Sequence, residues 1–179
     1  MPGTPPLSDA QVRAVLEQRE RLQEIADLRL TAPDVQALLQ STTERAATEM
    51  QLPIGLVSIV LDEAQYFAAR VGIPDWIEEA EGTPAEWSFC RYAVASQEPL
   101  IVDNAADDDR LKENPLVTVD GLRCYAGVPL VSSRGHALGS FCVAGVEART
   151  FSDAELARLH ELAAEVMRQI EARRVRGTA

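Results

Sequence analysis

The sequence predicts an α+β fold in which helices cover a central antiparallel sheet. Two observations lead to this class. Helical periodicity is confined to the two ends of the chain, whereas the middle contains pairs of apolar segments separated by short polar turns. Each such pair is typical of a β-hairpin, and hairpins between terminal helices favour segregated layers over alternating βαβ units.

The N-terminal part predicts two helices. In residues 8–29, Ser8 is a suitable N-cap and apolar side chains recur on one stripe, so we expect a single helix there. Residues 31–34 are Thr-Ala-Pro-Asp, which indicates a break and a restart with Pro33 in the first turn of the second helix. That second helix is expected to continue to about Met50.

From Pro53 onward the apolar pattern changes to that of strands. Two hairpins are predicted, with their strands at residues 54–61, 65–71, 123–131 and 137–143. The turns at residues 62–63 and 132–135 contain the Asp, Glu, Ser and Gly residues that such connections favour.

The segment between the hairpins is less regular. Residues 72–87 are rich in Gly, Pro and Glu and predict a long acidic loop. A short helix is expected at residues 88–96 and a short strand at residues 99–102. Residues 103–117 are polar, and we expect a short helix around residues 109–111.

Residues 152–155 are Ser-Asp-Ala-Glu, which resembles a capping box and predicts that the last helix begins there. These patterns predict a tail and helical arm at residues 1–30, one domain at residues 31–172 and a C-terminal tail at residues 173–179.

Composition excludes several classes of partner. The chain carries 17 basic and 28 acidic residues, a net charge of −11, and the acids are concentrated in the middle of the chain. We therefore expect it to bind neither nucleic acid nor anionic membranes. No basic leader precedes an apolar run, and no run approaches the roughly 20 residues of a bilayer span. The odd number of cysteines predicts reduced thiols and a cytoplasmic location.

Short motifs along most of the chain resemble those of one known family. They include Ser-Phe-Cys at residues 88–90, Asn-Pro-Leu-Val at residues 114–117, Arg-Cys-Tyr-Ala-Gly-Val-Pro-Leu at residues 123–130 and Leu-Gly-Ser-Phe-Cys-Val at residues 138–143. Together they resemble the GAF domains of bacterial signalling proteins. The resemblance covers residues 21–172 and implies terminal helices on one face of the sheet, with short helices and loops roofing a pocket on the other.

The resemblance also implies a sensory or regulatory role without catalysis. We expect a stand-alone domain that binds a small-molecule ligand or a signalling protein partner and signals through its terminal helices. The sequence names neither the ligand nor a cofactor. The candidate pocket residues, either a ligand wall or a core plug, are Trp87, Phe89, Cys90, Tyr92, Asp103, Asn104, Arg123 and Tyr125.

Two other functions remain open. The first is a thiol-based reductase of the free methionine sulfoxide reductase type, which shares the architecture, although the sequence around its cysteines differs from that around Cys90 and Cys124. The second is a ligand-free dimerisation module. The cysteines lack the close pairs of a metal site, and both His136 and His160 are expected at the surface, so we predict neither metal nor catalytic residues.

A homodimer is expected through the ends of the chain. The terminal helices combine apolar stripes with both charge signs, whereas the acidic middle would repel a second copy. The residues expected to remain for this interface are Leu16, Leu22, Ile25, Val166 and Ile170.

Overall fold

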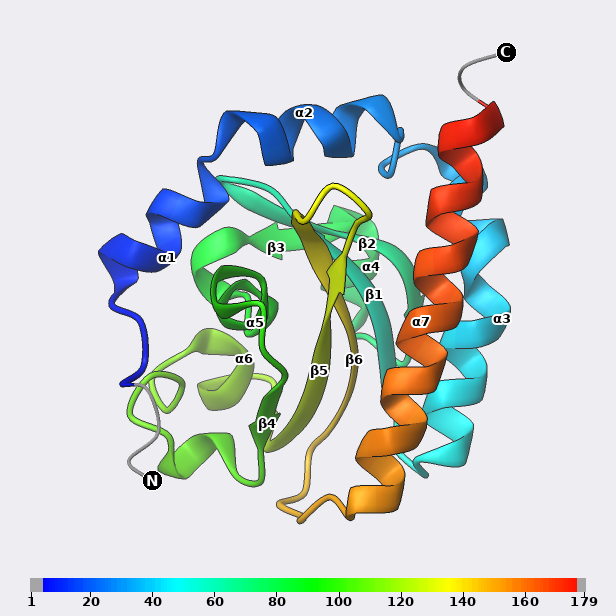
Figure 1. Cartoon of the computed structure of the whole chain (residues 1–179). Coiled ribbons are helices and arrows are strands. Elements are labelled where there is room, and N and C mark those ends of the chain that lie inside the picture. The colour runs from blue at the N-terminus through cyan, green and yellow to red at the C-terminus, as the bar shows by residue number, and fades with distance from the viewer. Residues whose placement is uncertain (1–4, 177–179) are drawn as a thin grey trace.

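A six-stranded antiparallel sheet lies between two layers of helices in the computed structural model, which describes residues 5–176 (Figure 1). The strand order is β3–β2–β1–β6–β5–β4. The strands are β1 (Ile54–Val60), β2 (Ala64–Val71), β3 (Gly82–Pro84), β4 (Leu100–Val102), β5 (Cys124–Val131) and β6 (Ala137–Gly145). The predicted hairpins are present as β1–β2 and β5–β6, and they confirm the α+β class.

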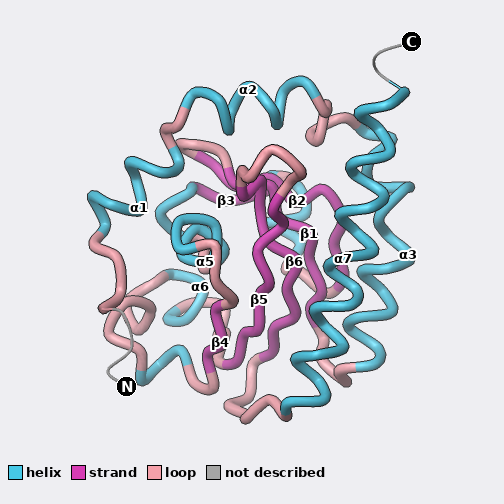
Figure 2. The backbone as a smooth tube through the Cα atoms, viewed as in Figure 1, coloured by secondary structure: helices cyan, strands magenta, loops and turns pink. Residues whose placement is uncertain are grey.

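Helices of very different length surround this sheet (Figure 2). The α-helices are α1 (Asp9–Leu16), α2 (Arg19–Asp27), α3 (Pro33–Glu49), α4 (Asp75–Ala80), α5 (Cys90–Ser96), α6 (Pro115–Thr118) and α7 (Asp153–Arg176). Two short 3₁₀ helices are η1 (Ala85–Trp87) and η2 (Ala105–Asp107). Within the described residues, no helix has both the length and the apolar character that crossing a membrane requires.

The two faces of the sheet carry separate cores. Helices α3 and α7 pack side by side on one face, where Val57 and Ile59 of β1 point. On the other face, Leu56 and Val60 join a second core with α1, α5 and the loop around Leu111. This division follows from the alternation of side chains along a strand. The central strand β6 is buried along its whole length because helices cover it from both sides.

The N-terminal residues form two helices, which corrects the single helix expected over residues 8–29. Helix α1 packs against α5, and α2 lies across the top of the molecule toward the end of α7 (Figure 1). The fully buried Arg21 stabilises the break, since its guanidinium donates hydrogen bonds to the carbonyl oxygens of Val15 and Leu16 at the end of α1. The same side chain donates to the Val60 carbonyl oxygen at 2.6 Å, which fixes the corner to the sheet.

The irregular middle is more ordered than its composition predicts. Residues 72–87, expected as a loop, contain α4, β3 and η1, and β3 extends the sheet by pairing with β2. The helix expected around residues 109–111 is wrong: those residues form a turn between η2 and α6. Asn104 and Asn114 supply the side-chain caps that start these two short helices.

At the C-terminal end, the predicted capping box of α7 is confirmed. The backbone N–H of Glu155 donates to Ser152 Oγ at 3.1 Å, and the N–H of Ser152 donates to Glu155 Oε2 at 2.8 Å. Helix α7 continues to Arg176, into the segment expected as a tail, while residues 1–4 and 177–179 lie outside the described residues.

Most of the residues expected to form a dimer interface are buried by other elements of the same chain. Leu16 and Ile25 are each 3% exposed, and Val166 and Ile170 are fully buried, so this set cannot form the interface. Only Leu22 is half-buried. The reason is that α1 packs against α5, α2 against β6, and α7 against β5 and α3, so their apolar stripes are buried within the chain.

Candidate functional site

A cavity of about 210 Å³ lies between the sheet and the segment that carries α4, α5 and α6. Its wall is mainly apolar, with Ile54, Leu56, Phe67, Ile77, Leu116 and Leu122. Four polar or titratable side chains interrupt this wall: Gln65, Cys90, Asp120 and Tyr125. A mostly apolar cavity with a few fixed polar groups is typical of a small-molecule site, although this volume is below the roughly 300–1,000 Å³ of drug-sized pockets.

Gln65 is held in one orientation by a buried polar network. Its Oε1 atom accepts hydrogen bonds from Ser58 Oγ at 2.8 Å and from Ser88 Oγ at 2.7 Å. Its Nε2 atom donates to Thr83 Oγ1 at 2.7 Å. All four residues are buried, and a satisfied network of this kind makes the wall rigid.

Tyr125 and two cysteines form a second polar group at the cavity. The Tyr125 hydroxyl lies 3.0 Å from Cys90 Sγ and 3.4 Å from Ser140 Oγ. Cys90 Sγ lies 3.9 Å from Cys142 Sγ. Space for the tyrosine comes from Gly127, where a Cβ atom would lie only 2.3 Å from the Tyr125 hydroxyl oxygen.

The contacts of Cys90 shift the pKa values of Cys90 and Cys142 in opposite directions. Hydrogen bonds with Cys142 and Tyr125 lower the pKa of Cys90 despite its burial. The same bond with Cys90, together with burial, raises the pKa of Cys142. Cys90 is therefore the thiol of this pair that ionises first.

Among the residues that the structure describes, Asp120 is the one carboxylate in the cavity wall. Its Oδ1 atom accepts a hydrogen bond from Trp76 Nε1 at 3.2 Å. Its Oδ2 atom is buried and receives no hydrogen bond from any described residue. A buried carboxylate oxygen without a donor is costly, so it is a suitable acceptor for a ligand N–H or O–H group.

Three of the candidate pocket residues line this cavity, namely Phe89, Cys90 and Tyr125. Phe89 and Tyr125 also contact each other edge to face, with ring centroids 5.4 Å apart. Cys90 begins α5, which covers most of the short helix expected at residues 88–96.

The other candidates lie outside this cavity. Two guanidinium groups lie near the Tyr92 ring, with Arg91 at 4.7 Å and Arg110 at 5.3 Å from its centroid. Arg123 donates to the Val117 carbonyl oxygen and so ties α6 to β5.

Asp103 and Asn104 stabilise the chain rather than the cavity wall. Asp103 Oδ2 accepts from Thr150 Oγ1 at 3.4 Å, and Asn104 accepts from the Ala106 N–H at 3.2 Å to begin η2. In place of these residues, the wall uses apolar side chains of β1, β2, α4 and the α6 region. Sequence reasoning missed them because they have the same pattern as ordinary core residues.

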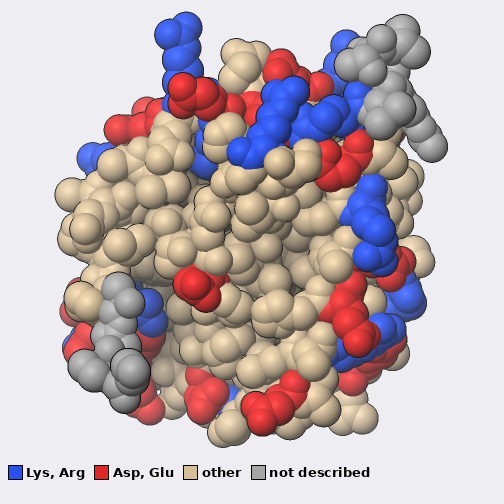
Figure 3. All heavy atoms as spheres, in the orientation of Figure 1, with Lys and Arg blue, Asp and Glu red and all other residues tan. Residues whose placement is uncertain are grey.

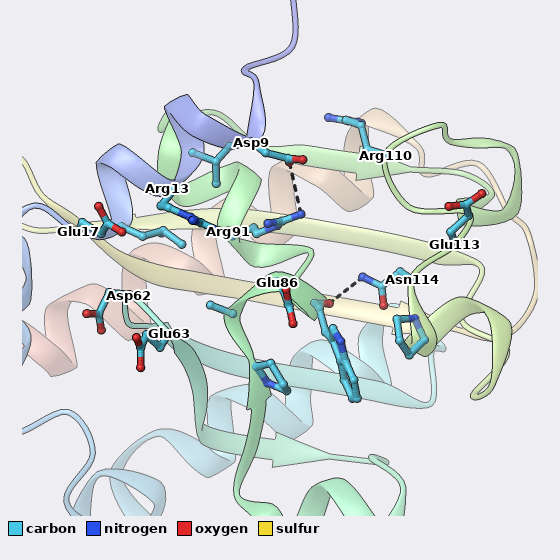
Figure 4. A pocket seen from close by; sticks show the side chains of 16 residues that line it. Asp9, Arg13, Glu17, Asp62, Glu63, Glu86, Arg91, Arg110, Glu113 and Asn114 are labelled. Atoms are coloured by element: carbon cyan, nitrogen blue, oxygen red, sulfur yellow. Dashed lines mark hydrogen bonds and ion pairs between the residues drawn. The ribbon is translucent and has the colours of Figure 1, made fainter.

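Trp87 lines a different hollow, a polar groove of about 630 Å³ between α1 and the rest of the molecule (Figure 4). Its carbonyl oxygen accepts from Asn114 Nδ2 at 3.0 Å. Arg91 points into this groove and lies 3.7 Å from Asp9 of α1. Arg13 and Arg110 are also present, but six carboxylates outnumber the three guanidinium groups: Asp9, Glu17, Asp62, Glu63, Glu86 and Glu113. The groove therefore does not favour a phosphate or another anion.

His136 departs from its expected exposure. Its side chain is 26% exposed, and Nδ1 lies 2.6 Å from Oε2 of the buried Glu24 in α2. In the part of the chain that the structure describes, no group of three or more His, Cys, Asp or Glu side chains is arranged to hold a metal ion.

Comparison with known proteins identifies the family of this chain. The GAF domain model matches residues 34–170. A cyclic di-GMP phosphodiesterase of Pseudomonas aeruginosa is 35% identical over 127 residues, which are 70% of this chain but only 21% of that enzyme. The chain thus spans about a fifth of the length of this relative.

Solved structures share the fold at low identity. The GAF domain of a phosphoenolpyruvate-protein phosphotransferase from Coxiella burnetii matches with a TM-score of 0.67 and 19% identity, over 96% of this chain and all of that domain. Free methionine-R-sulfoxide reductase from Neisseria meningitidis, solved with its substrate, matches with a TM-score of 0.63 and 20% identity, over 94% of each chain. The family match and the shared architecture agree, and the chain belongs to the GAF domain family.

Proposed function

We propose that this GAF domain is a non-catalytic sensor that binds a small ligand in the cavity above β1, β2 and β6. The observation that carries the proposal is the apolar cavity with one buried, unpaired carboxylate oxygen on Asp120. The ligand has a compact apolar body, because the wall is mostly aliphatic, and a hydrogen-bond donor, because Asp120 accepts. The donor is cationic or strongly polarised, since it meets a carboxylate.

Helix α5 is the proposed route from the cavity to the terminal helices. Phe89 precedes α5 and Cys90 begins it, and both line the cavity. Helix α5 also packs against α1, where Val12 and Leu16 belong to the same core as Phe89. A ligand that moves the first turn of α5 therefore changes the packing of α1 on α5. A signalling protein partner, or an output domain as in longer relatives, receives this change in our proposal.

We further propose a homodimer through α7 and β5, in the cytoplasm. A shallow groove of about 460 Å³ lies between these elements, lined mainly by Val128, Pro129, Val131, Ala163, Ala164 and Met167. It opens on the side of the molecule where charged side chains are sparse over a broad area (Figure 3). Arg168 and Glu171 at its rim have opposite charges, so the surface complements a second copy of itself. The three unpaired thiols suit a reducing compartment.

Benzylamine and benzoate test the cavity, since they share one ring and differ in charge. We expect benzylamine to raise the melting temperature of the full chain more than benzoate does, because binding to the folded state stabilises it. Asp120→Asn should remove this preference. Ala144→Leu should abolish both effects, because Ala144 lines the cavity and its extension fills it.

Ala106→Leu is the matched control, because Ala106 is exposed in η2. It should respond to both probes as the wild type does. Equal responses of the wild type and Ala144→Leu would contradict the cavity as the binding site. Native mass spectrometry of the chain from its own host then identifies the natural ligand.

A further inference from the structure

Two of the three cysteines meet beside the cavity although 52 residues separate them in the sequence. Cys90 begins α5 and Cys142 lies in the middle of the central strand β6, with their Sγ atoms 3.9 Å apart. This separation is that of a hydrogen bond between two reduced thiols, about 2 Å longer than a disulfide bond. Cys124 lies on the opposite face of the sheet, in the core under α3 and α7, and is separated from both.

The two neighbouring thiols differ in access and in chemistry. Cys90 lines the cavity, so a small molecule that enters it meets this sulfur first. Cys142 is fully buried behind it. The hydrogen bond from Tyr125 reaches Cys90 at 3.0 Å and stabilises its thiolate. Cys90 therefore has the character of an attacking thiol, and Cys142 that of a resolving thiol.

We propose that Cys90 and Cys142 form a peroxide-sensitive dithiol, which closes to a disulfide inside the GAF domain and reopens on reduction. This site goes beyond the proposed ligand binding and does not depend on it, because hydrogen peroxide is small enough to reach Cys90 through the cavity.

The chemistry balances in two steps. In the first step, Cys90 releases its proton and the thiolate attacks one oxygen of hydrogen peroxide. An S–O bond forms, the O–O bond breaks, and the leaving hydroxide combines with the released proton to become water. Cys90 is now a sulfenic acid. In the second step, Cys142 sulfur attacks Cys90 sulfur, the S–O bond breaks, and the hydroxyl leaves with the Cys142 proton as a second water. The two sulfurs have supplied the two electrons that reduce the peroxide.

Disulfide formation should move α5 rather than β6. Cys142 is fixed because its strand pairs on both sides, with Leu56 of β1 and Gly127 of β5 as register partners. Cys90 lies in the first turn of a seven-residue helix. Shortening the contact from 3.9 Å to a bond draws this turn toward Cys142 of β6. Because α1 packs on α5, oxidation reaches the same helix as the proposed ligand signal.

The test treats the full native chain with hydrogen peroxide, then denatures it and blocks the remaining thiols with N-ethylmaleimide before peptide mass spectrometry. We expect two of the three thiols to be lost, a crosslink between the Cys90 and Cys142 peptides, and recovery of all thiols with dithiothreitol. The wild-type result does not depend on the folding of any variant.

Three variants sharpen the assignment. Cys124→Ser is the matched control, because Cys124 is buried but distant from the pair, and it should form the same crosslink. Cys142→Ser should stop at a Cys90 sulfenic acid, which dimedone traps after denaturation, whereas Cys90→Ser should give neither product. Oxidation of Cys124 as readily as Cys90, or crosslinks only between molecules or only after unfolding, would overturn the proposal. The benzylamine response of the reduced chain is measured separately. Failure of the dithiol proposal is therefore distinguishable from failure of the ligand proposal.

Discussion

Nδ1 of His136 lies 2.6 Å from Oε2 of Glu24, and this contact joins the β5–β6 turn to helix α2. Glu24 is 1% exposed and also accepts a hydrogen bond from Ser132 Oγ at 3.0 Å. Arg174 of α7 forms an ion pair with its other oxygen. One buried carboxylate thus connects α2, the hairpin turn and the last helix. A buried charge is tolerated only when its partners satisfy it in this way.

The Glu24 cluster predicts acid-sensitive stability. Burial alone would raise the pKa of Glu24, but hydrogen bonds from His136, Arg174 and Ser132 outweigh it and lower this pKa below its ordinary value. A carboxyl whose pKa is lower in the folded state stabilises the fold above its unfolded pKa and loses that effect as the pH falls through its folded pKa. Glu24→Gln should therefore cost about 2–3 kcal/mol at neutral pH, and less in acid.

Urea denaturation of wild type and Glu24→Gln at about pH 7 and about pH 4 measures this difference. Glu20→Gln is the control, because Glu20 is exposed on the same helix. A difference between wild type and Glu24→Gln that does not shrink in acid would contradict the assigned role of the carboxylate.

The hydrogen bonds of Arg21 should stabilise the break between α1 and α2. Its fully buried guanidinium donates to four carbonyl oxygens, those of Val15, Leu16, Val60 and Ala137. Arg21→Met keeps much of the apolar stem but leaves these acceptors without their donor, so we expect a loss of about 2–4 kcal/mol in unfolding free energy. The exposed Arg19→Met should change stability by less than about 0.5 kcal/mol. Hydrogen exchange should show the loss first in α1 and α2.

The proposed dimer predicts a concentration-dependent mass in sedimentation. Ala164→Glu places a charge on the exposed face of α7, inside the groove with β5, and should yield a monomer that keeps the wild-type circular dichroism. Ala14→Glu, on the exposed face of α1, should leave the dimer intact. A monomer with Ala14→Glu and a dimer with Ala164→Glu would instead place the interface on α1. A wild type that stays monomeric at high micromolar concentration would contradict the dimer itself.

A non-catalytic sensor should not turn over free methionine sulfoxide. Cys90 is the thiol to examine, because it lines the cavity and has a lowered pKa. We expect no sulfide product above background with dithiothreitol as reductant, in the wild type or in Cys90→Ser. Product that requires Cys90 and reaches many turnovers per protein would instead support the reductase function. A single oxidation of the thiol pair remains compatible with a sensor.

The sequence determined the α+β class, both hairpins and the long terminal helix, because these depend on local periodicity and capping. Leu56 and Val57 lie on opposite faces of the sheet for the same local reason. The motif Ser-Phe-Cys also indicated the right part of the chain, since Phe89 and Cys90 do line the cavity.

Tertiary structure alone decided what these residues contact. The meeting of Cys90 with Cys142, and of Glu24 with His136 and Arg174, depends on strand order and on where helices cross the sheet, which no spacing along the chain encodes. The break before Arg21 was hidden for the same reason: its hydrogen-bond acceptors lie in β1 and β6 as well as in α1. Aliphatic residues have one pattern whether they face a core or a cavity, so only the packed chain separates Leu122, in the wall, from Leu130, in the core.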